Sequence, residues 1–200
     1  MTISLIVTDA SPLITLAVAG ALDTLLLARL RVIVPDMVRH EIVRYPEKPG
    51  AMEVMEWIRA HEPDEVTVGS TTEYEEFLIL QKANPAVRIR NRGELAAAEI
   101  LTHELEHKID AAILLFEDSD IRKPNFLIRL PDNVLVMSTF EFLSGLEKAR
   151  LIKNAQAILA RAVTLRGNEV LARYVDATSG AEAMRDDWPA RLRKTKPASY

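Results

Sequence analysis

The 200-residue sequence contains no cysteine, which excludes disulfide bonds and thiolate metal sites. This absence suits a reducing compartment, and we expect a cytoplasmic protein. The longest mainly apolar run, from Pro12 to Leu22, is about half of the roughly 20 residues that a membrane helix needs. No basic region precedes the first apolar stretch, so we expect neither a signal peptide nor a membrane segment.

A large excess of charge of one sign is also absent. The net charge is −4, whereas a protein that coats nucleic acid is strongly basic. Basic residues gather only locally, at Arg88, Arg90 and Arg92 and in a C-terminal tail. The tail residues are Arg191, Arg193, Lys194 and Lys196.

Short apolar runs alternate with segments of helical periodicity. The predicted strands are Ile3–Thr8, Arg31–Val34, Glu65–Val68, Ile113–Phe116 and Val134–Met137. The predicted helices lie near 11–29, 36–45, 50–60, 71–82, 92–108 and 139–148. Two of the strands are almost continuously apolar, as in parallel sheets covered on both faces. The alternation therefore predicts an α/β fold with a mainly parallel sheet.

The pattern changes near residue 148, after which only helical segments follow, at 151–165 and 169–175. We therefore predict an α/β domain over 1–148 and a helical extension over 149–188. The residues from 189 to 200 include two prolines and four basic side chains. We expect them to form a poorly ordered basic tail.

Acids follow both of the most apolar strands. Asp9 ends the first, and Glu117, Asp118 and Asp120 follow the strand at 113–116. The carboxyl ends of parallel strands share one edge of a sheet, which is where ligands bind. Alternatively, Asp9 could cap the helix that begins near Ser11, and the acids at 117–120 could form a solvated loop or a helix cap.

Two further acids lie early in helices. Glu41 falls at the edge of the apolar face of the helix at 36–45, and Glu94 heads the apolar stripe of the helix at 92–108. Glu41 could simply extend to solvent, Glu94 could form a capping box with Asn91, and Glu99 is expected to be solvated. The expected buried stripe beyond Glu94 consists of Ala97, Ala98, Leu101 and Leu105.

These acids together predict a metal site. Carboxylates in one place repel one another and raise each other's pKa unless a cation compensates. Ligands that are all oxygen suit Mg²⁺ or Mn²⁺.

The segments that carry the acids resemble, in this order, the PIN-domain nuclease family, which includes the toxin ribonucleases of bacterial toxin–antitoxin pairs. The resemblance covers roughly residues 1–150 and is closest to PIN-like proteins with extra C-terminal helices. The segments are 7–14 (VTDASPLI), 34–42 (VPDMVRHEI), 92–98 (RGELAAA), 114–122 (LLFEDSDIR), 134–139 (VLVMST) and 142–143 (FL).

The resemblance implies a three-layer α/β/α fold in which Asp9, Glu41 and Glu94 bind metal. The fourth acid would be Asp118, with Glu117 or Asp120 as alternatives. The resemblance implies a polar residue, Ser11, just after the first acid, and Ser138 or Thr139 at the rim of the site.

The resemblance also implies Mg²⁺- or Mn²⁺-dependent endonucleolytic cleavage of RNA that leaves a 5′-phosphate. Arg88, Arg90 and Arg92 could hold substrate phosphates, or they could form a solvated basic loop. The expected partners are RNA, an antitoxin that inserts into the acidic site, and further copies of the chain, for which the helical region 36–60 offers apolar surface. The alternative is a PIN-like module that binds RNA or protein without cleavage.

One motif points to another enzyme class. His103, Glu104 and His107 fit the H-E-x-x-H pattern of zinc peptidases. The helical wheel places both histidines about opposite Glu94, and charged residues flank the motif. We therefore rank the zinc peptidase below the nuclease.

Overall fold

Five parallel strands form the centre of the molecule in a computed structural model, which describes residues 2–87, 91–107, 109–117, 130–166 and 188–192. The strands run in the order β3-β2-β1-β4-β5 across the sheet. Their bounds are β1 (Ile3–Thr8), β2 (Arg31–Pro35), β3 (Val66–Gly69), β4 (Ala111–Leu115) and β5 (Val134–Met137). The predicted parallel sheet is confirmed, with the first strand of the chain at its centre.

The helices fall close to the predicted segments, with one clear exception. They are α1 (Ala10–Val18), α2 (Asp36–Val43), α3 (Ala51–His61), α4 (Thr72–Ala83), α5 (Arg92–His107), α6 (Thr139–Lys148) and α7 (Ala155–Arg166). The single helix predicted over 11–29 is wrong. Helix α1 stops at Val18, Gly20 takes a φ of 60°, and a 3-10 helix, η1 (Leu22–Leu25), follows. The helix predicted at 169–175 lies outside the described residues.

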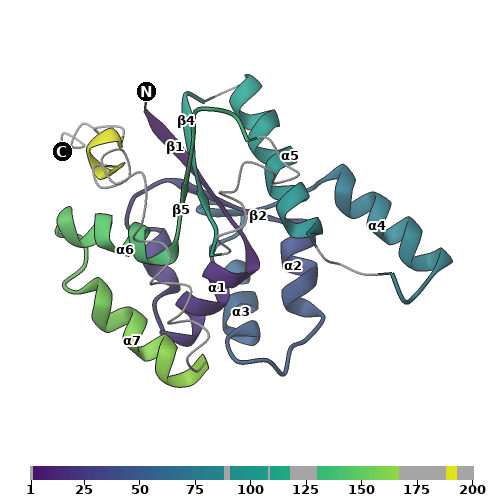
Figure 1. The fold of residues 1–200 in the computed structure, drawn as a ribbon, viewed down its shortest axis with the longest axis horizontal. Helices are drawn as coiled ribbons and strands as arrows, with labels where there is room; N and C mark the ends of the chain where they lie inside the picture. Colours follow the sequence, from purple (N-terminus) through teal and green to yellow (C-terminus); the bar gives the residue numbers. More distant parts are fainter. Residues whose placement is uncertain (1, 88–90, 108, 118–129, 167–187, 193–200) are drawn as a thin grey trace.

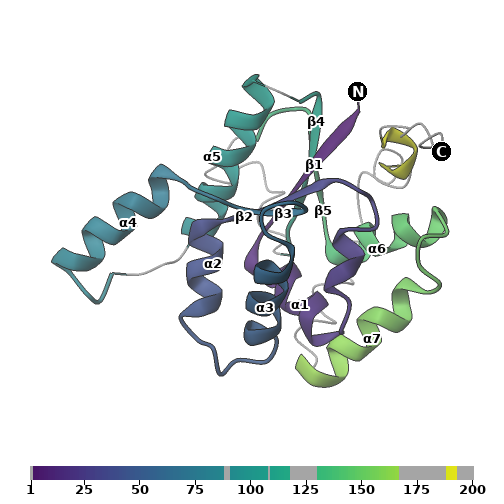
Figure 2. The same cartoon turned by 180° about the vertical axis from the view of Figure 1, so that it is seen from behind.

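Helices cover both faces of the sheet, as Figures 1 and 2 show. Ile6 of β1 packs into a core with α1, α3 and α6, whereas Leu5 and Val7 pack on the other face against α5. Because both faces of β1 are buried, its sequence carries no polar alternation. The three-layer α/β/α architecture is therefore confirmed.

The buried face of α5 differs from the predicted stripe. Ala97 and Leu101 are buried as expected, but Ala98 and Leu105 are only half-buried. The other buried residues among those described in this helix are Gly93, Ala96, Ile100 and Glu104. The reason is a second contact, because α5 packs on α2 and α4 as well as on the sheet, and Ala96 joins a small core there.

The described C-terminal segments pack onto the α/β body. Helix α7 contacts α1 and α6, and the 3-10 helix η3 (Trp188–Arg191) contacts α6. The Trp188 ring is fully buried and stacks on Phe142, with ring centroids 5.1 Å apart. Leu192 bridges to Ile3 at the start of β1. The chain around 188–192 is thus attached to the central strand, and the domain division at 148 stays a prediction.

No helix in the described residues is both long enough and apolar enough to cross a bilayer.

Candidate functional site

Asp9 lies at the carboxyl end of the central strand. Its backbone N–H donates to the Leu115 carbonyl at 3.1 Å, which joins the ends of β1 and β4. Asp9 occupies the N-cap position of α1, but its side chain makes no capping hydrogen bond. The interpretation that the Asp9 side chain caps the helix is therefore wrong.

Glu41 and the start of α5 meet Asp9 at this edge. A Cβ atom added to Gly93 would lie 3.3 Å from Asp9 Oδ1 and 3.4 Å from Glu41 Oε1. The backbone N–H of Gly93 donates to the Glu41 carboxylate. The end of β1, the second turn of α2 and the first turn of α5 therefore converge on one place.

The electrostatics of Glu41 place Glu94 in the same cluster. Burial raises the pKa of Glu41, and the negative charges of Asp9 and then Glu94 raise it further, to about 8. The Gly93 N–H opposes the shift because it stabilises the charged form. The structure thus brings together three of the acids that the sequence singled out.

The fourth acid is described only in part. Glu117 follows β4, is buried, and accepts a 2.7 Å hydrogen bond from the Thr139 hydroxyl at the start of α6. Asp118 and Asp120 lie outside the described residues. The choice among these three acids stays a prediction.

The predicted polar residues occupy different environments. Ser11, in the first turn of α1, lines a cleft together with Glu41. Ser138 is buried and caps α6 through a reciprocal capping box with Glu141, so its hydroxyl already serves the helix. Thr139, next in the chain, is the residue that contacts an acid of this edge.

Arg92, one of the three predicted phosphate-binding arginines, forms an ion pair with Glu73 of α4. Its guanidinium carbon also lies 5.5 Å from the centre of the Phe77 ring. Arg92 therefore ties α5 to α4. Arg88 and Arg90 lie outside the described residues.

Glu104, the acid of the H-E-x-x-H motif, has a structural role. Glu104 is buried and forms an ion pair with Arg31 of β2. His103 is exposed, and the His107 side chain is not among those described. An acid neutralised by an arginine is poorly suited to activate a zinc-bound water, which weakens the peptidase interpretation.

Within the described segments, no three histidine or acidic side chains have the spacing of a complete metal-ligand set. The chemistry of the acid cluster nevertheless fits a hard divalent cation. Asp9, Glu41 and Glu94 supply only carboxylate oxygens, the donors that Mg²⁺ and Mn²⁺ prefer. A cation there would also relieve the repulsion that raises the pKa of Glu41.

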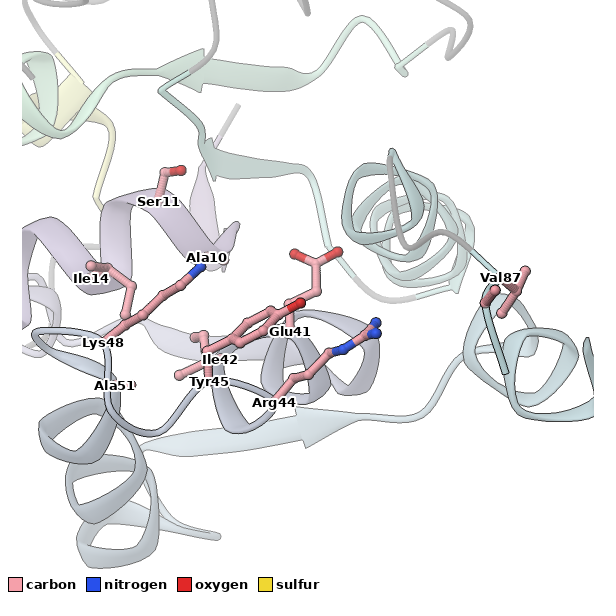
Figure 3. A pocket seen from close by; sticks show the side chains of 11 residues that line it. Ala10, Ser11, Ile14, Glu41, Ile42, Arg44, Tyr45, Lys48, Ala51 and Val87 are labelled. Atoms are coloured by element: carbon pink, nitrogen blue, oxygen red, sulfur yellow. The ribbon is translucent and has the colours of Figure 1, made fainter. Parts of the chain in front are cut away.

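Four residues near the acids carried a signal that the sequence interpretation did not use. Gly93 directly precedes Glu94, and a glycine beside an acid marks a close backbone approach. Arg44, Tyr45 and Lys48 follow Glu41 at intervals of three, four and seven residues, so two basic side chains and an aromatic ring come directly after a candidate acid. Together with Glu41, these three line a cleft of about 540 Å³, shown in Figure 3.

The sequence profile of one protein family, described as PIN domain, matches residues 5–162. The match spans β2 to β5, most of β1 and the acids at 9, 41, 94 and 117. It ends within α7. No curated protein matches the chain at a significant level.

Proposed function

Because this chain belongs to the PIN domain family, whose members are generally nucleases and usually use divalent metals, we propose that it is an Mg²⁺- or Mn²⁺-dependent endoribonuclease. The observation that carries the proposal is the meeting of Asp9, Glu41 and Glu94 at the carboxyl edge of the sheet. Carboxylates that lie together and repel one another are stabilised if they bind a divalent cation.

The three acids would hold the metal, and Glu117 or a neighbouring acid would complete the set. A bound divalent cation lowers the pKa of a water and stabilises charge on the phosphate and the leaving oxygen. The Gly93 N–H orients the Glu41 carboxylate, which loses its proton when a cation replaces it. Thr139 fixes the direction of Glu117 through its hydroxyl.

The proposed reaction is hydrolysis of an internal RNA phosphodiester. The oxygen of a water forms a bond to phosphorus, and the bond from phosphorus to the 3′ oxygen breaks. The 3′ oxygen takes up a proton and leaves as a hydroxyl, while the other product keeps a 5′-phosphate.

Asp9→Asn tests the proposal most directly. Wild-type protein should cleave mixed-sequence single-stranded RNA in Mg²⁺ or Mn²⁺ and stop when a chelator is added. Asp9→Asn should lower the cleavage rate on the order of 100-fold or more, since a metal ion contributes several kcal/mol to such reactions. Asp64→Asn, at an exposed turn, is the matched control and should retain the wild-type rate.

Intact RNA with wild-type protein in every divalent metal tried would refute the nuclease. RNA that is bound but never cut would favour the non-cleaving PIN-like module instead. The antitoxin partner and the oligomeric state stay predictions, because none of the described contacts tests them.

A further inference from the structure

The cleft beside Glu41 contains two cations and an aromatic ring. It is lined by Ser11 and Ile14 of α1 on one side and by Val87 on another. Arg44, Tyr45 and Lys48 lie in the turn that follows α2. The cleft therefore combines an acid of the proposed metal site with positive charge and apolar surface.

Neither cation of the cleft has an acidic partner among the residues that the structure describes. Among the described residues, Arg31 and Arg92 form ion pairs, whereas Arg44 and Lys48 form none and are exposed. Their described contacts are with the Tyr45 ring, whose centre lies 4.2 Å from Lys48 Nζ and 5.6 Å from Arg44 Cζ. Tyr45 therefore holds two positive charges at the cleft without neutralising either of them.

The close-up of the cleft shows one cation on either side of the acid. In the view of Figure 3, the Glu41 carboxylate lies between the end of the Lys48 side chain and the Arg44 guanidinium. Lys48 extends toward the start of α1, and Arg44 extends toward Val87. A chain molecule that crosses the cleft at Glu41 therefore meets a positive charge before and after the acid.

We propose that Arg44 and Lys48 bind the phosphates on either side of the scissile linkage of a single-stranded RNA, and that Tyr45 positions both cations. This inference rests on the proposed nuclease function, because it places the scissile phosphate at the acids. A polynucleotide carries one negative charge per linkage, so it matches cations that flank a metal-held phosphate.

The size of the cleft favours a single strand. Clefts of a few hundred cubic ångströms accommodate a ligand of drug size, which corresponds to one or two unstacked nucleotides and not to a duplex. Unstacked bases are available in single-stranded RNA and can rest on the partly exposed apolar side chains of Ile14 and Val87.

The test measures binding separately from cleavage. A fluorescein-labelled 12-nucleotide RNA is titrated with Asp9→Asn protein in chelator, and the dissociation constant is followed by anisotropy from 50 to 200 mM KCl. Each lost phosphate contact lowers the salt slope by about 0.7 for single strands. Adding Arg44→Gln and Lys48→Gln should therefore lower the slope of log Kd against log salt concentration by about 1.4. Between 50 and 200 mM KCl, RNA binding by this variant should then weaken about sevenfold less than binding by the parent protein.

The matched control carries Arg59→Gln and Lys153→Gln, two exposed positions with the same total charge. Its slope should equal that of the parent protein. An equal slope in the cleft variant and the control would overturn the inference.

Tyr45 is tested as a positioning residue. Tyr45→Leu should lower the slope in part, and the conservative variant Tyr45→Phe should restore it, because a phenyl ring still attracts the two cations. Equal loss in both variants would contradict the positioning role.

Two further results separate this inference from the nuclease proposal. Cleavage by wild-type protein without a slope difference would refute the phosphate contacts and leave the nuclease standing. A slope difference without any cleavage would refute the nuclease and leave the contacts. If the cleft variant loses affinity for poly-glutamate but not for RNA, the cleft binds an acidic polypeptide and the inference is wrong.

Discussion

At the scale of single residues, Gly93 shapes the acid site through its backbone. Its backbone N–H donates to Glu41. Its Cα carries only a hydrogen where another residue would have a Cβ, and that Cβ would lie within 3.4 Å of two carboxylate oxygens and of Val38 Cγ2. An alanine methyl there would displace Asp9 or Glu41, because α2 and the central strand leave little room to move. Gly93 thus allows α5 to approach the acids closely enough for its backbone N–H to reach Glu41.

Gly93→Ala should lower RNA cleavage about 10- to 100-fold, the range typical for residues that orient metal ligands. Gly69→Ala is the control, since its added Cβ would lie 2.6 Å from Ile100 Cδ1 instead of near an acid. Gly69→Ala should lower the melting temperature but keep the cleavage rate per folded molecule. If the two variants lose activity only in proportion to lost stability, Gly93 has no orienting role.

Glu41 makes the stability of the metal-free protein depend on pH. Its pKa rises from 4.5 to about 8 on folding, so between these values the native state holds a proton that the unfolded chain has released. The free energy of unfolding therefore falls as pH rises through this window, by at most about 1.4 kcal/mol per pH unit. Urea denaturation in chelator from pH 5 to 8 measures this slope.

Glu41→Gln should flatten that slope, and Glu53→Gln on the exposed face of α3 should not. Saturating Mn²⁺ should also flatten the slope in the wild type, because the ion replaces the proton. Equal slopes in the wild type and Glu41→Gln would show that the carboxyl does not titrate in this window.

At the scale of elements, α4 depends on a side chain from its neighbour. The expectation that Glu99 is solvated is wrong, since its carboxylate accepts the N–H groups of Thr72 (2.7 Å) and Glu73 (3.2 Å) at the start of α4. Figure 1 shows α4 projecting from the body, and contacts at its first turn help to hold it together with the buried Phe77. A carboxylate there satisfies orphan donors and complements the helix dipole.

Glu99→Ala should destabilise α4 by about 1 kcal/mol, as loss of a capping side chain does. Hydrogen exchange should then quicken at the amides of α4 while those of β1 keep their protection. Glu76→Ala, exposed on α4 itself, is the control. Uniform acceleration across the whole protein would show that Glu99 supports the global fold and not α4 in particular.

These contacts also explain how far the sequence could predict the structure. The buried strands β1 and β4 were evident because each is an almost continuous apolar run, and the described acids after them, Asp9 and Glu117, were found in this way. The rotation of α5 about its axis could not be predicted, because it depends on packing against α4. Glu104 pairs with Arg31, and Glu99 accepts hydrogen bonds at the start of α4. Both partners lie in elements distant in sequence, so neither contact could be predicted.

The residues of the candidate site also fall into those visible in the sequence and those that depend on tertiary packing. Asp9, Glu41 and Glu94 could be selected because each occupies an unusual place for an acid on a strand or helix. The cations were assigned less well, because Arg92 looked available in the sequence but pairs with Glu73. Arg44 and Lys48 became candidates only once the fold showed that they flank the acid in one cleft.

At the scale of the whole molecule, the described C-terminal residues close the core beside β1. Gly145 lacks a side chain where a Cβ would lie 1.8 Å from Trp188 Nε1, so the indole lies directly on the α6 backbone. Phe142 stacks on the indole, and Leu192 bridges to Ile3. The segment at 188–192 is therefore part of the folding unit.

Trp188→Ala should lower the free energy of unfolding by about 3–5 kcal/mol, the usual cost of removing a buried indole. Trp188→Phe, which keeps a ring on Phe142, should cost less. Chemical denaturation with far-ultraviolet circular dichroism checks both variants. An unchanged midpoint in Trp188→Ala would show that this segment does not contribute to the stability of the body.

The central place of β1 has a consequence for the order of synthesis. Thr8 pairs with Leu115, so β1, which Asp9 directly follows, can pair with β4 only after β4 has been synthesised much later. At roughly 5–20 residues per second, that delay lasts on the order of 5 to 20 seconds. Throughout it, the nascent chain sits beside ribosomal and messenger RNA with its acids still apart. If the chain is the ribonuclease proposed above, it would become active only after most of its length has left the ribosome.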